Sequence, residues 1–103
     1  MPARTPLSDD QIAAALADLD GWRAEADEDG NRIVRDDEFA DFREAFAFLT
    51  RVAFVAEAMD HHPEIANVYN HVSLALSTHD AGNRVTETDL AFASHVNEFA
   101  AGR

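Results

Sequence analysis

The stretch of sequence that decides the fold spans residues 72–78 and reads Val72-Ser73-Leu74-Ala75-Leu76-Ser77-Thr78. Large apolar residues occupy every second position, and small residues lie between them. Because successive side chains of a strand point to opposite faces of a sheet, this pattern predicts a β-strand with one buried face. The other face would carry only small side chains.

Three more strands are expected before this one. Residues Ile65–Tyr69 form its hairpin partner, with a turn around Asn70-His71. An earlier hairpin joins Trp22–Ala26 to Asn31–Arg35 through the turn-forming residues 27–30. The strands are therefore expected in two consecutive pairs.

Helical signals separate these hairpins and flank them. Ser8 and Gln11 form a capping box that opens a first helix, which is expected to end at Gly21. The segment Thr86-Glu87-Thr88-Asp89 opens a last helix in the same way. Between the hairpins, residues Glu38–Met59 follow helical spacing, and this helix must stop before Pro63.

The middle helix is also expected to supply much of the core. Its apolar stripe is wide and contains five phenylalanines, which we assign to the core: Phe39, Phe42, Phe46, Phe48 and Phe54. The whole pattern predicts one α+β domain over residues 8–103, after a flexible leader at residues 1–7. Its two layers have the order αββαββα, with helices on one face of a four-stranded antiparallel sheet.

The composition excludes several kinds of chemistry. The 103 residues include no cysteine and no lysine, so no thiolate nucleophile, zinc–thiolate site or lysine Schiff base can form. A net charge of −12 disfavours nucleic acid and anionic membranes as partners, whereas a small neutral ligand is compatible with it. The charged first twenty residues and the lack of a long apolar run predict a cytoplasmic protein.

Candidate functional residues gather between Glu57 and Asp89, which enclose four of the five histidines. His61 and His62 precede Pro63, which stiffens the corner, and adjacent extended residues point to opposite sides. The two rings would therefore take different roles at a pocket mouth. The alternative is that they only cap the preceding helix, whose C-terminus favours imidazolium.

The remaining candidates also have structural interpretations. His79 shares strand parity with the small residues 73, 75 and 77, or it lies in a solvated loop just beyond. Asp89 is the fourth residue of a capping box, and Glu57 lies in the last turn of a helix, where it could simply be solvated. Three histidines and a carboxylate could hold zinc or iron, but the usual ligand spacings are missing, so no metal is expected. His71 and His95 are interpreted as bystanders.

Taken together, these motifs resemble one known family. Glu57, His61-His62-Pro63, the Asn67-x-Tyr69-Asn70 strand, Ser77-Thr78-His79 and a downstream Asp89 are similar in order and spacing to pterin-4a-carbinolamine dehydratases. The likeness covers nearly the whole chain. One departure is visible, because the family's compact Gly-Gly-Leu-Thr turn is replaced by residues 82–86, which are one residue longer. This shifts the spacing to Asp89.

The resemblance implies a function and a set of site residues. The reaction would be dehydration of 4a-hydroxytetrahydropterin to quinonoid dihydropterin, which recycles the cofactor of aromatic amino acid hydroxylases, with no cofactor or metal of its own. The catalytic residues would be His61, His62 and His79. The substrate-binding residues would be Asp89, Glu57 and Pro63. The alternative is a non-catalytic dimerisation or regulatory protein with the same fold.

The sequence also predicts self-association. The strand at residues 72–78 carries no lysine, proline or inward charge, the devices that protect a sheet edge. If it lies at an edge, a second copy could pair with it through a two-fold axis. The resemblance likewise implies a homo-oligomer, either a dimer or a tetramer.

Overall fold

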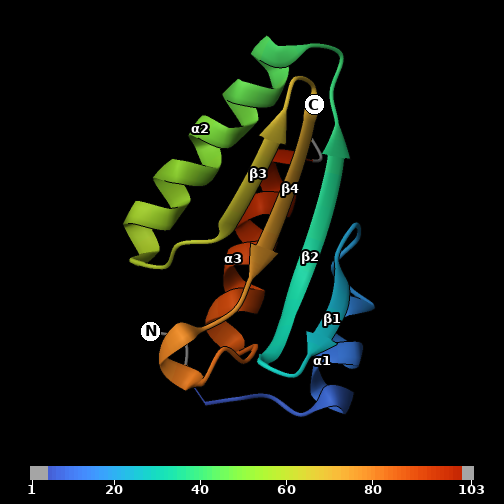
Figure 1. Ribbon diagram of the computed structural model, residues 1–103, viewed down its shortest axis with the longest axis vertical. Helices are drawn as coiled ribbons and strands as arrows, with labels where there is room; N and C mark the ends of the chain where they lie inside the picture. The colour runs from blue at the N-terminus through green and yellow to red at the C-terminus, as the bar shows by residue number, and fades with distance from the viewer. Residues whose placement is uncertain (1–4, 101–103) are drawn as a thin grey trace.

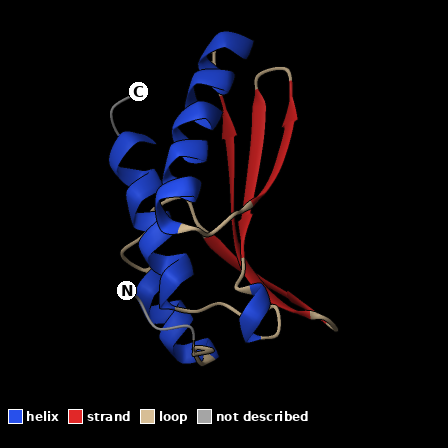
Figure 2. Ribbon diagram, turned by 90° about the vertical axis from the view of Figure 1, so that its left-hand side faces the viewer, coloured by secondary structure: helices blue, strands red, loops and turns tan. Residues whose placement is uncertain are grey.

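The computed structural model describes residues 5–100 and confirms the predicted order of elements (Figure 1). The elements are α1 (Asp9–Leu16), β1 (Arg23–Asp27), β2 (Gly30–Glu38), α2 (Phe42–Met59), β3 (Glu64–Val68), β4 (His71–Leu76), the 3-10 helix η1 (His79–Ala81) and α3 (Glu87–Ala100). The strands form one antiparallel sheet, and the long helices α2 and α3 lie against one of its faces (Figure 2). The two-layer α+β architecture is therefore as expected.

The sheet has the strand order β1-β2-β4-β3, so the strand at residues 72–78 is central, and the edge pairing considered for it cannot form. In β4, Leu74 pairs with Arg35 of β2 on one side and with Ile65 of β3 on the other. An alternating pattern shows which face is buried but not how many neighbours a strand has. The edges of the sheet are β1 and β3.

The core lies between the sheet and the long helices. Val72, Leu74 and Leu76 of β4 are buried against it, together with Phe92 and Val96 of α3. The three β4 residues are the large side chains of the alternating pattern. The small residues of β4 point to the opposite face, which no helix covers in Figure 2.

The expectation that all five phenylalanines belong to the core is wrong. Phe48 is buried, and so is Phe39, which precedes α2 rather than lying within it. Phe42, Phe46 and Phe54 expose 45%, 55% and 73% of their surfaces. The buried side of α2 is instead made by residues spaced along its opposite face, namely Ala45, Phe48, Val52 and Ala56. An aromatic stripe thus faces outward.

Several boundaries also differ from expectation. Strand β2 continues to Glu38, where the middle helix was expected to begin, and α2 starts only at Phe42. Ser8 and Gln11 do form the capping box of α1, but α1 ends at Leu16 and turns continue the chain to Gly21. In the second hairpin, Tyr69 adopts a positive φ of 50°, and His71 already belongs to β4. Over residues 5–100, none of the helices is both long and apolar enough for a bilayer span.

The first described residues join the fold at one point. Of the segment expected to be a leader, residues 1–4 lie outside the described part of the chain. Leu7 packs against the core, and its amide donates a hydrogen bond of 2.9 Å to the carbonyl of Val85.

Candidate functional site

The histidine pair is positioned by the way α2 ends. Asp60 follows the helix in the left-handed region, with φ 50°, and the amide of His61 donates to the carbonyl of Ala56 at 3.0 Å. This six-to-one bond is the Schellman pattern, which turns the chain sharply. His61 is consequently directed into the protein while His62 faces outward, so the two rings do point in different directions.

His61 is a buried residue that pairs with the start of α3. Only 6% of it is exposed, and its Nε2 lies 2.6 Å from Oδ1 of Asp89. The ring also contacts Phe92, with centroids 6.2 Å apart. Burying an imidazole is unfavourable unless its polar atoms are satisfied, and the carboxylate satisfies one of them.

Asp89 combines the two roles that the sequence left open. Its Oδ2 accepts hydrogen bonds from the backbone amide of Thr86 at 2.9 Å and from Oγ1 of Thr78 at 2.8 Å. The first of these is the capping-box bond, and Oδ1 is left for His61. Asp89 has no exposed surface, so its carboxylate does not contact solvent. Sequence reasoning missed Thr78, although it is the middle residue of Ser77-Thr78-His79.

His62 pairs with a different carboxylate. Its Nε2 donates to Oε2 of Glu57 at 2.7 Å, and the two side chains are 60% and 78% exposed. Glu57 lies in the last turn of α2, so the helix and the corner before Pro63 hold the pair together. Exposed pairs of this kind are worth little to stability. The pair matters because Glu57 fixes the position of the His62 imidazole.

His62 and His79 line the same pocket, which has a volume of about 180 Å³. His79 begins η1, just beyond the end of β4, which is the second of the two positions that the sequence left open for it. The lining residues are Arg32, His62, Glu64, Ala75, Ser77, His79 and Asn83. Ala75 belongs to the small-residue face of β4 and Ser77 directly follows the strand, so the pocket opens on the uncovered side of the sheet. His61, Asp89, Glu57 and Pro63 are not among the lining residues.

Three polar side chains of this pocket were not singled out in the sequence: Arg32, Glu64 and Asn83. Arg32 also donates to Asp27 at 2.7 Å, and this hydrogen bond raises the pKa of Arg32. The guanidinium is therefore a permanent positive charge beside the two histidines. Its strand position could have been read from the sequence, but its place in the pocket depends on how β2 pairs with β4.

The longer turn before α3 leaves Asp89 in contact with His61. The turn closes where the amide of Thr78 donates to the carbonyl of Arg84 at 2.9 Å. Within it, Gly82 and Asn83 take positive φ values of 75° and 60°. The additional residue is thus accommodated inside the turn, before α3 begins.

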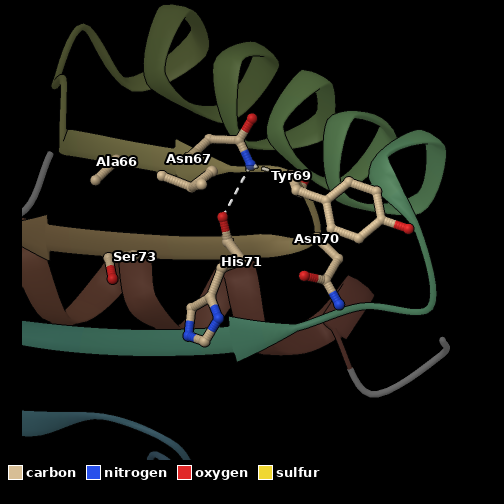
Figure 3. A pocket seen from close by; sticks show the side chains of 7 residues that line it. Ala66, Asn67, Tyr69, Asn70, His71 and Ser73 are labelled. Carbon is tan, nitrogen blue, oxygen red and sulfur yellow. Dashed lines mark hydrogen bonds between the residues drawn. The ribbon is translucent and has the colours of Figure 1, made fainter.

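A second hollow lies at the tip of the β3–β4 hairpin and is shown in Figure 3. It measures about 420 Å³ and is lined by residues 66–71 and Ser73. Asn67 Nδ2 donates to the carbonyl of His71 at 2.8 Å, and Asn70 Nδ2 donates to that of Phe39 at 2.9 Å. Asn67 therefore shapes the hairpin, whereas Asn70 connects its tip to the segment between β2 and α2. His71 lines this hollow and not the pocket of His62 and His79.

Comparisons with known proteins identify the family of the chain. The sequence profile of the family described as "Pterin 4 alpha carbinolamine dehydratase" matches residues 5–99. A relative from Mesorhizobium japonicum is 50% identical over 96% of this chain and 98% of its own length. One from Afipia carboxidovorans is 53% identical over 92% of each chain. Both carry pterin-4-alpha-carbinolamine dehydratase as a provisional name.

Two solved structures share the fold. One, described as a transcriptional coactivator/pterin dehydratase from Brucella melitensis, is 41% identical, with a TM-score of 0.85 over 93% of this chain and 99% of its own. The other, described as a pterin dehydratase-like protein that is a RuBisCO assembly factor in the alpha-carboxysome, is 25% identical. Its TM-score is 0.64 over 78% of this chain and 89% of its own. Since the profile covers nearly all of the described residues and the relatives match end to end, the chain belongs to the pterin 4 alpha carbinolamine dehydratase family.

Proposed function

We propose that this protein is a dehydratase that converts 4a-hydroxytetrahydropterin to quinonoid dihydropterin and water, and so recycles the cofactor of aromatic amino acid hydroxylases. The observation that carries the proposal is the pocket shared by His62 and His79. It places two imidazoles around one small cavity on the open face of the sheet. The family membership supports the same reaction.

The proposed chemistry requires two proton transfers. A protonated imidazole gives its proton to the 4a-hydroxyl group as the C–O bond breaks, and water leaves. A neutral imidazole takes the proton from the adjacent ring nitrogen, whose electron pair forms the new C=N bond. Histidine is suited to both tasks near neutral pH, and each is typically worth about 10²–10⁴-fold in rate. We assign these tasks to His62 and His79.

The other predicted residues support the pair in this proposal. His61 and Asp89 are assigned to binding and orienting the pterin in this proposal; because their 2.6 Å pair is buried and does not line the pocket, they would act by holding the corner that carries His62. Glu57 holds the imidazole of His62 in place through their 2.7 Å contact. Pro63 holds the corner that separates the two adjacent rings.

The test is direct. The purified protein is mixed with chemically generated 4a-hydroxytetrahydropterin, and quinonoid dihydropterin is followed by its absorbance. We expect acceleration over buffer that is lost when His62 and His79 are both replaced by alanine. A wild-type protein that does not accelerate the reaction would overturn the proposal.

A non-catalytic binding role is the second candidate. It is favoured by the outward aromatic face of α2, where the rings of Phe42 and Phe46 are in tilted contact with centroids 5.6 Å apart, and Phe54 is 73% exposed. Such a patch on a small protein marks an interaction surface. A related structure is described as an assembly factor, so the fold can carry such a role. Absence of dehydratase activity together with stable self-association would favour this candidate.

We also infer that the protein forms a homo-oligomer. Because β4 is central, the sheet can be extended only at β1 or β3. Strand β3 exposes Ile65 and Val68, which are 47% and 77% exposed, and contains no lysine or proline. The aromatic face of α2 offers a second surface. One of these contacts would give a dimer, and both together a tetramer.

A further inference from the structure

We propose that Asn83 is a positioning residue that fixes the tautomer of His79. In this arrangement Nδ1 of His79 carries the proton, and Nε2 is left as the proton acceptor of the pocket. The inference rests on the proposed function, because it gives His79 the role of the base. It adds a residue that belongs to the longer turn of this chain.

The contact itself is well defined. Oδ1 of Asn83 lies 3.1 Å from Nδ1 of His79, and both residues line the pocket that contains His62. His79 begins η1, and Asn83 follows directly after the glycine that ends it. The intervening turn therefore folds the asparagine back onto the ring.

The backbone of Asn83 is held on both sides. Its φ of 60° lies in the left-handed region, which asparagine tolerates better than most residues. Its carbonyl accepts a hydrogen bond of 3.0 Å from the amide of Asn31. The carbonyl oxygen of Asn83 also lies so close to Gly30 that a Cβ atom added to residue 30 would be 2.0 Å from this oxygen. The start of β2 thus fixes the position from which the Asn83 side chain reaches His79.

The tautomer follows from the chemistry of the two groups. An amide oxygen only accepts hydrogen bonds, so the nitrogen that faces it must carry a proton. In a neutral imidazole the other nitrogen then has the free electron pair. Nε2 can therefore accept a proton from a substrate ring nitrogen without a prior rearrangement. A ring free to exchange tautomers would spend part of its time with Nε2 already protonated and unable to act.

The experiment measures the tautomer first, independently of activity. Long-range proton–nitrogen NMR of ¹⁵N-histidine-labelled protein distinguishes the two neutral forms of His79. We expect the Nδ1–H form in the wild type. Asn83→Gly, which keeps the backbone freedom that a positive φ requires, should shift His79 towards the Nε2–H form. Asn83→Asp, which retains an accepting oxygen, should restore Nδ1–H. Arg84→Ala alters the neighbouring residue of the same turn and should leave the spectrum unchanged.

Activity provides the second readout. We expect Asn83→Gly to lower kcat by at least about tenfold with little change in KM. A loss of about tenfold is part of the rate enhancement that a positioned base supplies. Asn83→Asp should recover most of this loss. A wild-type ring in the Nε2–H form, or an unchanged tautomer in Asn83→Gly, would overturn the positioning role whatever the activity. The expected tautomers in a protein without dehydratase activity would uphold the contact and overturn the proposed function alone.

Discussion

Nε2 of His61 lies 2.6 Å from Oδ1 of Asp89, and this contact joins the end of α2 to the first turn of α3. Both residues are buried, and the same carboxylate caps α3 and binds Thr78 beyond β4. One side chain therefore connects a helix end, a helix start and the end of the central strand. Disturbing it should affect the fold as well as the site.

Replacing Asp89 with asparagine tests this connection. The amide group can no longer accept at both ends, so a buried donor from Thr78, Thr86 or His61 loses its partner. Leaving such a group unsatisfied costs about 1–3 kcal/mol. We expect urea unfolding at pH 7 to report a loss of this size. Glu87→Gln is the matched control, because Glu87 is an exposed acid in the same turn of α3 and should cost little.

The histidines should differ in their effect on turnover. His62→Ala and His79→Ala each remove an imidazole from the pocket, so we expect kcat/KM to fall by about 10²–10⁴-fold. His71→Ala and His95→Ala serve as controls, since neither lines that pocket, and they should retain most of the activity. A large loss in the controls, or full activity without His62 and His79, would contradict the assignment.

The pH dependence of the rate is a separate prediction. If imidazoles donate and accept the protons, kcat should change between roughly pH 5.5 and 8.5, where histidine changes charge. The measurement is the pH–rate profile of the wild type over a range in which circular dichroism shows an intact fold. A flat profile would point to catalysis by carboxylates or solvent.

Local signals predicted much of this molecule, because each involves residues close together in the chain. The capping box at Ser8, the end of α2 before Pro63 and the opposite directions of His61 and His62 all depend on backbone geometry over a few residues. The alternation in β4 likewise showed its buried face. These parts of the fold and site could be predicted.

The errors concern long-range pairing. Whether β4 is central depends on where β2 lies, and β2 is some forty positions earlier in the chain. Which side of α2 faces the core depends on α3 and the sheet, and many apolar residues on both sides obscure the choice. The contacts of Arg32 and Asn83 with the pocket arise from the same tertiary arrangement. A short sequence motif therefore could not predict these two contacts.

An acidic residue on the open face gives a prediction about pKa. Ser73 donates a hydrogen bond to Asp36, and Arg23 pairs with the same carboxylate at 2.7 Å, and these contacts lower the pKa of Asp36. Ser73→Ala should raise that pKa towards its ordinary value, as measured by NMR titration of the Asp36 side-chain carboxyl carbon. Asp36→Asn identifies the resonance. An unchanged midpoint would show that Arg23 alone accounts for the shift.

The sign of the stability effect follows. A carboxyl group with a lowered pKa in the folded state stabilises the protein above its unfolded pKa, and this stability is lost as the pH falls through the folded value. The wild type should therefore exceed Ser73→Ala in stability more at pH 7 than at pH 3. The side chain of Asp36 is 41% exposed, so solvent screening keeps the difference small.

The last prediction concerns the aromatic face of α2. Phe46 and Phe54 lie four positions before and after Thr50, and Arg43 and Glu57 lie seven positions before and after it. These separations correspond to about one and two helical turns. Two copies of α2 packed antiparallel across a two-fold axis at Thr50 would therefore bring unlike charges together at both ends and phenylalanines together between them. The face is complementary to itself.

This symmetry makes the oligomer testable by charge. Light scattering at moderate salt and micromolar concentration should give a mass of at least twice the 11.3 kDa monomer. Phe46→Asp should weaken association, whereas Ser94→Asp, which adds the same charge to an exposed position of α3, should not. Arg43→Glu places like charges opposite one another and should also weaken it, and adding Glu57→Arg should restore it. A monomeric wild type would rule the oligomer out, and an oligomer insensitive to these changes would move its contact from α2 to an edge of the sheet.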